Sequence, residues 1–110
     1  MEPVRGNLDM LILAVLADGP AHGYAQIEAL RARSGGTFDI AEGTLYPALH
    51  KLEAAKVVRS RWEDVNGRRR RVYSITASGQ RSLAERHTRW SAVRDAIDAV
   101  MGGAAWASAT

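Results

Sequence analysis

The sequence contains no cysteine, which excludes both disulfide bonds and thiol chemistry. It also lacks a long hydrophobic run, because the longest, from Leu11 to Ala17, is far too short to cross a membrane. Residues 1–6 lack the basic region and long apolar stretch of a signal peptide. The chain has 110 residues, 46% of them hydrophobic, which suits one domain with a real core. We therefore expect a cytoplasmic protein without a membrane segment.

Catalytic motifs are absent as well. His22, His50 and His87 stand far apart and do not have the spacing of metal ligands. The sequence has no phosphate-binding glycine loop, and no serine stands near a histidine that would mark it as a nucleophile. We expect the histidines to serve as caps, surface residues or interface residues. The expectation is a protein that is not an enzyme and holds no metal or cofactor.

Positive charge is concentrated in one part of the chain. The formal net charge is only +3, but residues 51–71 carry eight cations and three acids. Of the 15 cations in the chain, 13 are arginine, whose guanidinium suits bidentate contacts with phosphate or guanine. This asymmetry favours an anionic partner such as double-stranded DNA. A solvated basic surface is the alternative.

The hydrophobic pattern predicts three short helices in the first half of the chain. The first follows Asn7, a plausible N-cap, and stops at residues 19–20, which are Gly-Pro. The second begins near residue 22 and ends at residues 35–36, two glycines, and the third covers about residues 42–55. Short helices joined by tight turns indicate a helix-turn-helix. Because the first helix is apolar nearly all round, we expect a second subunit or a second layer to cover it.

A β-hairpin is predicted next. Residues 57–65 and 70–76 are rich in valine and aromatic residues with charged residues between them, as is typical of strands. Asn66-Gly67 lies between them and is the strongest short hairpin signal, because both residues accept a positive φ. Arg68, Arg69 and Arg70 lie at its tip and are candidates for DNA contacts, along the backbone or in a minor groove. Alternation sends strand side chains to opposite faces, so not all the arginines can touch DNA. A solvated charge run is the alternative.

A long helix is predicted from Thr76 or Ser78, as the cap, to residues 102–103, two glycines. Its hydrophobic residues approach a heptad spacing, which favours a helix–helix dimer seam. The predicted fold is α+β: a winged helix-turn-helix over residues 1–76, a dimerisation helix over 77–103 and a flexible tail over 104–110. The candidate dimer and effector residues are Leu83, Trp90, Val93, Ile97 and Met101.

The third predicted helix combines an apolar face, on which Leu45, Leu49 and Leu52 recur at i, i+4 and i+7, with a polar face. A helix that enters the major groove reads bases with its N-terminal residues, and a glycine there lets the backbone come close. Proline fixes its own φ, so we expect the regular helix to start at Pro47, after a loosely wound first turn. Packing of Tyr46 and Pro47 between helices is the alternative. The candidate DNA-contacting residues of this helix are Gly43, Thr44, Tyr46, Pro47, His50 and Lys51.

Several short segments together resemble one known family. They are His22–Tyr24 (HGY), Gly43–Glu53 (GTLYPALHKLE), Gly67–Thr76 (GRRRRVYSIT) and Gly79. In this combination and at this spacing they are similar to the PadR family of bacterial transcriptional regulators. The resemblance runs from about residue 8 to residue 101. It implies a winged helix-turn-helix, a two-fold dimer through the C-terminal helix, and repression relieved by a ligand.

The resemblance also implies roles for single residues. Tyr24, Thr44, Tyr46 and the arginines of the hairpin would face DNA. Trp90 would line a pocket for a flat aromatic effector near the two-fold axis, unless it simply fills the interface. The chain departs from the family at Lys56, where glycine is usual, which leaves the turn there open.

The sequence therefore predicts a dimeric, sequence-specific DNA-binding regulator. We expect a repressor that binds a pseudo-palindromic operator with half-sites about 34 Å apart. The alternative is a winged-helix module that binds protein and uses its basic patch only as a solvated face.

Overall fold

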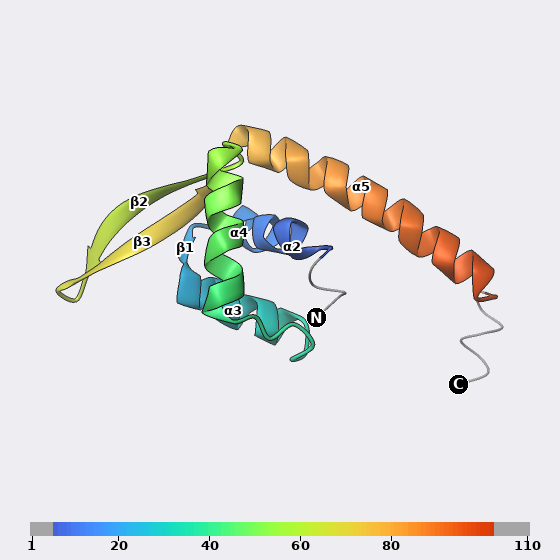
Figure 1. The fold of residues 1–110 in the computed structure, drawn as a ribbon, viewed down its shortest axis with the longest axis horizontal. Helices are drawn as coiled ribbons and strands as arrows, with labels where there is room; N and C mark the ends of the chain where they lie inside the picture. The colour runs from blue at the N-terminus through green and yellow to red at the C-terminus, as the bar shows by residue number, and fades with distance from the viewer. Residues whose placement is uncertain (1–5, 103–110) are drawn as a thin grey trace.

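The computed structural model describes residues 6–102 and has an α+β architecture (Figure 1). The strands form one antiparallel sheet in the order β1-β3-β2. Three helices pack around the base of the sheet, and the fourth extends from it, so the α+β winged helix-turn-helix prediction is confirmed. The elements are α2 (Leu8–Ala17), β1 (Ala21–His22), α3 (Gly23–Arg33), α4 (Glu42–Ala54), β2 (Val58–Val65), β3 (Arg68–Ile75) and α5 (Ala77–Val100).

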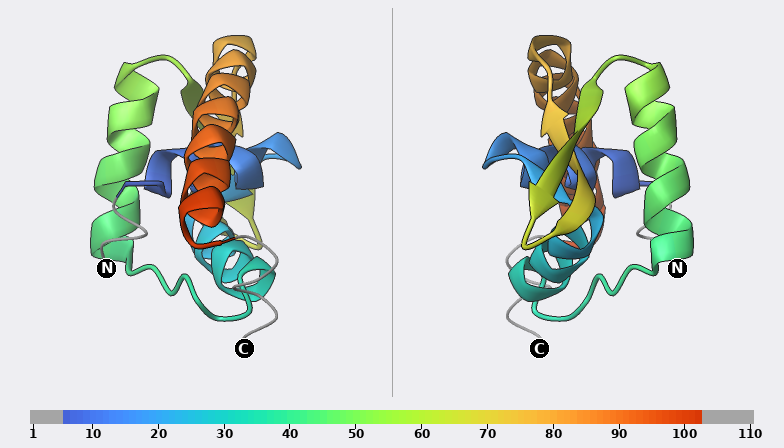
Figure 2. Two further views of the ribbon diagram at one scale, coloured as in Figure 1. Left: turned by 90° about the vertical axis from the view of Figure 1, so that its right-hand side faces the viewer. Right: turned by 90° about the vertical axis from the view of Figure 1, so that its left-hand side faces the viewer.

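The molecule is elongated, with principal extents of 56 × 27 × 21 Å. The β2–β3 hairpin and α5 project from the body in opposite directions (Figure 1). Two further views show α4 standing to one side of the hairpin (Figure 2). None of the helices in residues 6–102 combines the length and the hydrophobicity that a membrane-spanning helix needs.

The hydrophobic core explains the apolar surface of α2. Ile12, Leu13 and Leu16 are buried against α3, α4 and the sheet. On its other side, α2 contacts α5 of the same chain, where Leu11 lies near Leu83. The predicted second layer over α2 is therefore provided in part by α5. The buried hydrophobic residues are Leu8, Ile12, Leu13, Val15, Leu16, Leu30, Ile40, Leu45, Leu49, Leu52, Val58, Val72 and Tyr73.

The start of α4 corrects the prediction for Pro47. The helix begins five residues earlier, and the Leu45 amide already donates a hydrogen bond to the Ala41 carbonyl at 3.0 Å. Pro47 therefore lies inside a regular helix. In an α-helix its missing N–H would have bonded the carbonyl of Gly43, which is an exposed residue of the first turn. The proline costs little there, because water can reach that carbonyl.

The end of α4 explains the departure at Lys56. Its φ is 65°, the left-handed conformation that favours glycine. The Val57 amide donates to the Leu52 carbonyl at 3.1 Å, and the Lys56 amide donates to the Glu53 carbonyl at 3.0 Å. These two hydrogen bonds form a Schellman motif. Lys56 therefore occupies the left-handed position of this turn, which glycine fits best.

The start of α5 is built on the same turn. Thr76 is the N-cap, as predicted, and its hydroxyl accepts a hydrogen bond from the Gly79 amide at 3.0 Å. The hydroxyls of Thr76 and Ser78 both donate to the Lys56 carbonyl, at 2.8 and 2.9 Å. A Cβ at Gly79 would collide with the Val57 carbonyl oxygen, so only glycine fits there. This joint fixes the direction in which α5 leaves the body.

The hairpin has the predicted turn. Asn66 and Gly67 have φ values of 52° and 77°, and Val65 pairs with Arg68 across the turn. The strands begin at residues 58 and 68, so the second is longer than predicted. Strand β1 was not predicted. Two residues are too few to show alternation, and they pair with β3 only because α2 and α3 bring them alongside it.

Candidate nucleic-acid interface

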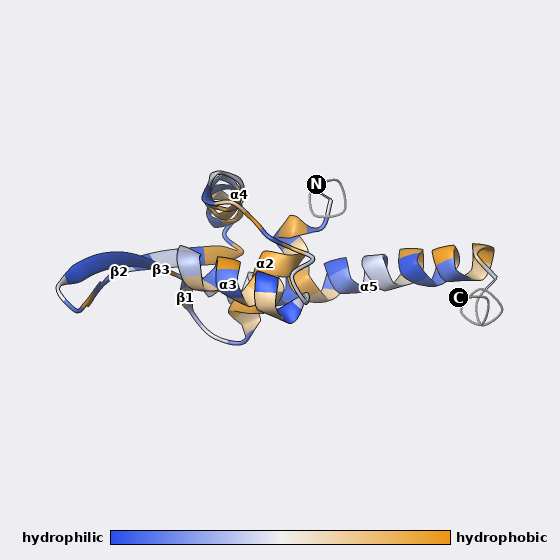
Figure 3. Cartoon of the chain, turned by 90° about the horizontal axis from the view of Figure 1, so that it is seen from below, coloured by the Kyte–Doolittle hydropathy of each residue, from blue (hydrophilic) through white to orange (hydrophobic). Residues whose placement is uncertain are grey.

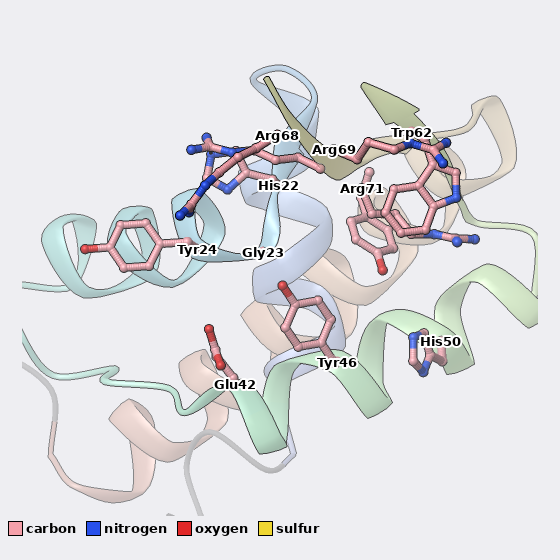
Figure 4. Close-up of a pocket in the computed structure, with 12 residues that line it drawn as sticks. His22, Gly23, Tyr24, Glu42, Tyr46, His50, Trp62, Arg68, Arg69 and Arg71 are labelled. Atoms are coloured by element: carbon pink, nitrogen blue, oxygen red, sulfur yellow. The ribbon is translucent and has the colours of Figure 1, made fainter. Parts of the chain in front are cut away.

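An open groove of about 920 Å³ lies between α3, α4 and the hairpin (Figure 4). The hairpin contributes four arginines, while α4 contributes Glu42, the one carboxylate among the lining residues. The groove is therefore strongly cationic and suits a polyanion. The lining residues are His22, Gly23, Tyr24, Glu42, Tyr46, His50, Trp62, Arg68, Arg69, Arg70, Arg71 and Tyr73.

Tyr46 joins the two helices that form one wall of the groove. Its ring rises from α4 toward α3, and its hydroxyl lies where a Cβ of Gly23 would be (Figure 4). The residue is half-buried, so packing between helices accounts for part of its role. The ring also lines the groove. Tyr46 therefore packs between the two helices, as the alternative interpretation has it, and also lines the groove.

The other predicted residues of the polar face divide into two groups. Gly43, Thr44 and Pro47 are exposed on α4 but do not line the groove, whereas His50 lines it. Lys51 is exposed, and its ammonium nitrogen lies 3.6 Å from a carboxylate oxygen of Asp9 in α2. Lys51 therefore belongs with the residues of the polar face that lie outside the groove.

The first turn of α3 presents an exposed aromatic ring. Tyr24 is 62% exposed and lines the groove one residue after Gly23. An aromatic ring with a hydroxyl and little cover is suited to a partner that is partly apolar and partly polar. Tyr24 therefore lies where a ligand of the groove would meet it.

His22 connects α3 with the hairpin, which the sequence did not indicate beyond a capping role. Its Nδ1 accepts from the Ala25 amide at 3.3 Å, as an N-cap. Its Nε2 lies 3.0 Å from Nη1 of Arg70, a group that can only donate. A neutral imidazole accepts at one nitrogen only, so one tautomer accepts from the Ala25 amide and the other accepts from Arg70.

The four arginines of the hairpin all line the groove, but they differ in how the protein holds them. Arg71 donates from Nε to the Ser60 hydroxyl at 2.9 Å. Arg69 is exposed and makes a long ion pair of 4.0 Å with Asp64. Arg68 is exposed at the turn, next to Gly67. Arg68 and Arg69 are therefore the arginines most available to an anion.

Two aromatic residues of the groove, Trp62 and Tyr73, were not predicted from the sequence. Burial raises the pKa of the Tyr73 phenol above its ordinary value, an effect that Arg71 opposes and Glu53 supports. The phenol therefore stays protonated at neutral pH. The hairpin register was the available signal, because the two-residue turn places Trp62 directly across from Arg71.

Comparison with known proteins identifies the family. The model of the PadR-like transcriptional regulator family matches residues 12–85. The chain belongs to this family. Transcriptional regulator Rv3488 of Mycobacterium tuberculosis is 40% identical over 81 residues, 74% of this chain and 73% of that protein. An uncharacterised protein X of Lysinibacillus sphaericus is 34% identical over 101 residues, 91% of this chain and 93% of that one.

Solved structures agree with the family assignment. A PadR family regulator from Eggerthella lenta is 33% identical, with a TM-score of 0.80 over 92% of this chain and 87% of that one. A transcriptional regulator from Clostridium thermocellum is 28% identical, with a TM-score of 0.83 over 89% of this chain and 96% of that one. The protein is thus a DNA-binding transcription regulator of the PadR-like family, and the groove belongs to its winged helix-turn-helix.

This PadR-like regulator has a second notable surface, on α5. The outer half of the helix mixes hydrophobic with hydrophilic residues (Figure 3). Val93, Ile97 and Met101 are exposed although they are apolar, and Trp90 is 37% exposed. Leu83 is half-buried against the core of the same chain. Of the residues predicted for the seam, Trp90, Val93, Ile97 and Met101 therefore form an uncovered apolar stripe in the single chain, whereas Leu83 packs against its own core.

A mainly apolar pocket of about 480 Å³ lies between α2 and α5 of the regulator. Trp90 and Phe38 contribute aromatic walls, and His87 and Asn7 contribute polar groups. The His87 ring lies 6.1 Å from that of Trp90, and the Arg94 guanidinium lies 5.0 Å from the Trp90 ring. The predicted flexible tail, with Trp106, lies outside the described residues.

Proposed function

We propose that this PadR-like regulator is a homodimeric repressor that binds a pseudo-palindromic DNA operator and leaves it when a flat aromatic effector binds. The groove is the observation that carries the DNA-binding part of the proposal. It places the arginine-rich hairpin opposite the N-terminal half of α4, with Tyr24 exposed beside them. A winged helix uses these two elements together on one duplex.

The two walls of the groove would do different work. The exposed first turn of α4, with Gly43 and Thr44, would enter the major groove and contact base edges. Arg68 and Arg69 would neutralise phosphates or reach into a minor groove. Tyr24, Tyr46 and His50 would contact the backbone between these two regions. Pro47 would lie against the duplex, whereas we assign Lys51 no contact because it pairs with Asp9.

The dimer rests on the uncovered stripe of α5. Exposed hydrophobic residues at Val93, Ile97 and Met101 are unfavourable in water and are suited to a second copy of the same helix. A two-fold axis there would present two recognition helices to half-sites about one helical turn apart, roughly 34 Å. The palindromic operator follows from this symmetry.

The effector site is proposed at Trp90. The indole borders an apolar pocket, and a two-fold axis along α5 would bring it toward the indole of the partner. Two indoles separated by a gap can stack on both faces of a planar ligand. Release of DNA requires that the ligand favour an arrangement in which the recognition helices are wrongly spaced.

Footprinting on the DNA upstream of its own gene, followed by salt titration, tests the DNA-binding part. Each phosphate contact lowers the slope of log K against log salt by about 0.9, so binding should weaken steeply. Replacing Arg68 and Arg69 with alanine should weaken operator and random DNA alike, whereas Thr44→Ala should cost more on the operator. Binding that hardly changes with salt would favour the protein-binding module instead.

Fluorescence titration with planar aromatic compounds tests the effector part. We expect a compound to quench the fluorescence of the native protein and to release it from DNA. The Trp90→Ala variant should show neither this quenching nor the release. A Trp90→Ala variant that still leaves DNA with the compound would place the effector elsewhere.

A further inference from the structure

Trp62 is an exposed aromatic residue in a hydrophilic hairpin. It lies on β2 and is 53% exposed, on the groove side of the hairpin. Two guanidinium groups cover its indole: Cζ of Arg69 lies 5.0 Å and Cζ of Arg71 lies 5.2 Å from the ring centroid. Both distances fall within the range of a cation–π interaction. Figure 4 shows the three side chains gathered above α4.

Arg71, one of the two arginines over the Trp62 ring, is linked to α4, the proposed recognition helix. Glu53, near the end of α4, accepts a hydrogen bond from the Ser60 hydroxyl at 2.6 Å. The Ser60 oxygen in turn accepts from Arg71 Nε at 2.9 Å, and Arg71 Nη2 lies 3.9 Å from the Glu53 carboxylate. Arg71 therefore has its charge balanced and its position set by α4. To bind a phosphate, Arg71 would have to lose its contacts with Ser60 and Glu53.

The Arg69 side of the stack is free to bind. Its side chain is exposed, and its ion pair with Asp64 is long and in contact with water, so it contributes little to orientation. The face of Trp62 is the contact that remains to hold the guanidinium over the groove. A continuous series of contacts therefore runs from α4 toward the tip of the hairpin. Its members, in order, are Glu53, Ser60, Arg71, Trp62 and Arg69.

We propose that Trp62 is a positioning residue for DNA binding, which holds Arg69 in place for a phosphate. This inference rests on the proposed DNA contact of Arg69. An arginine that is ordered before binding loses less side-chain entropy when it meets the phosphate. Trp62 itself makes no contact with DNA.

The test uses the full-length chain, a short random-sequence DNA duplex and the variants Trp62→Leu and Trp62→Phe. An exposed cation–π contact corresponds to a factor of about two to five in an equilibrium constant. We expect Trp62→Leu to weaken duplex binding about three- to fivefold, and Trp62→Phe, which keeps a ring, to weaken it less than about twofold. The midpoint of urea unfolding should stay near that of the native protein, because the residue projects from the body. The slope against salt should stay unchanged, because Arg69 keeps its charge.

Measuring Trp62→Leu in an Arg69→Ala protein distinguishes a positioning role of Trp62 from a direct contact of Trp62 with DNA. Arg69→Ala alone should reduce the salt slope by about 0.9, and Trp62→Leu should have no further effect in that background. An equal loss from Trp62→Leu with and without Arg69 would overturn the proposal, because the indole would then touch DNA itself. Native binding by Trp62→Leu would overturn it too. A native protein that fails to bind the duplex would overturn the proposed function and this inference with it.

Discussion

The Tyr46 hydroxyl occupies the space beside the Gly23 backbone that a Cβ would need. Gly23 opens α3 and Tyr46 lies in α4, so this contact sets how closely the two helices of the helix-turn-helix approach. It also explains why glycine stands at position 23 in a chain that has a tyrosine at position 46. Because Gly23 has no side chain, the Tyr46 ring can occupy this space.

Gly23→Ala is expected to displace Tyr46 without unfolding the protein, because the colliding atoms are the outer end of a flexible side chain. DNA binding should fall by about 1–2 kcal/mol, within the range of a lost specific contact. The loss should disappear when Tyr46 is already alanine, so a double-mutant cycle on operator DNA measures it. Additive losses would show that Gly23 acts independently of Tyr46.

Gly43→Ala should move stability and DNA binding in opposite directions. A Cβ at Gly43 meets no atom within 4 Å, and alanine is the better helix former by roughly 0.5–1 kcal/mol. The free energy of unfolding should therefore rise in urea titration. Operator affinity should fall, because the added methyl group stands between the helix backbone and the bases. Unchanged affinity would mean that this turn of α4 does not approach DNA closely.

Lys56→Gly should stabilise the fold. The residue has a φ of 65°, and a side chain in this conformation costs about 1 kcal/mol or more compared with glycine. We expect a gain of about 1 kcal/mol in the free energy of unfolding, measured by urea titration. Lys51→Gly is the matched control, because the same change inside α4 should instead destabilise by about 1 kcal/mol. A loss of stability in Lys56→Gly would point to a structural role for the lysine side chain.

Ile97→Asp should dissociate the proposed dimer. Ile97 is 56% exposed in the single chain, and in a dimer seam an unpaired carboxylate there would cost several kcal/mol. Sedimentation should show a monomer, while the unfolding of the monomer itself changes little. Ala92→Asp is the control, because five residues of helix turn it to the opposite side of α5. A stable Ile97→Asp dimer would exclude this stripe as the interface.

Local patterns determined most of the elements. The spacing of Leu45, Leu49 and Leu52 identified the buried face of α4, because helical periodicity depends only on neighbours in the chain. Asn66-Gly67 determined the hairpin and its register, because a two-residue turn needs two residues that accept a positive φ. Thr76 determined where α5 begins, because a cap satisfies the amides that follow it directly.

The tertiary structure decided which side chains meet across those elements. Lys51 and His50 are neighbours in the chain, but only the folded structure places Lys51 beside Asp9 and Arg71 beside Ser60 and Glu53. Strand β1 forms only because α2 and α3 place Ala21 and His22 alongside β3. Such contacts join residues that are distant in the chain, and their geometry depends on how the helices pack. A periodic pattern carries no information about that packing, so the contacts that hold Arg71 are evident only in the folded chain.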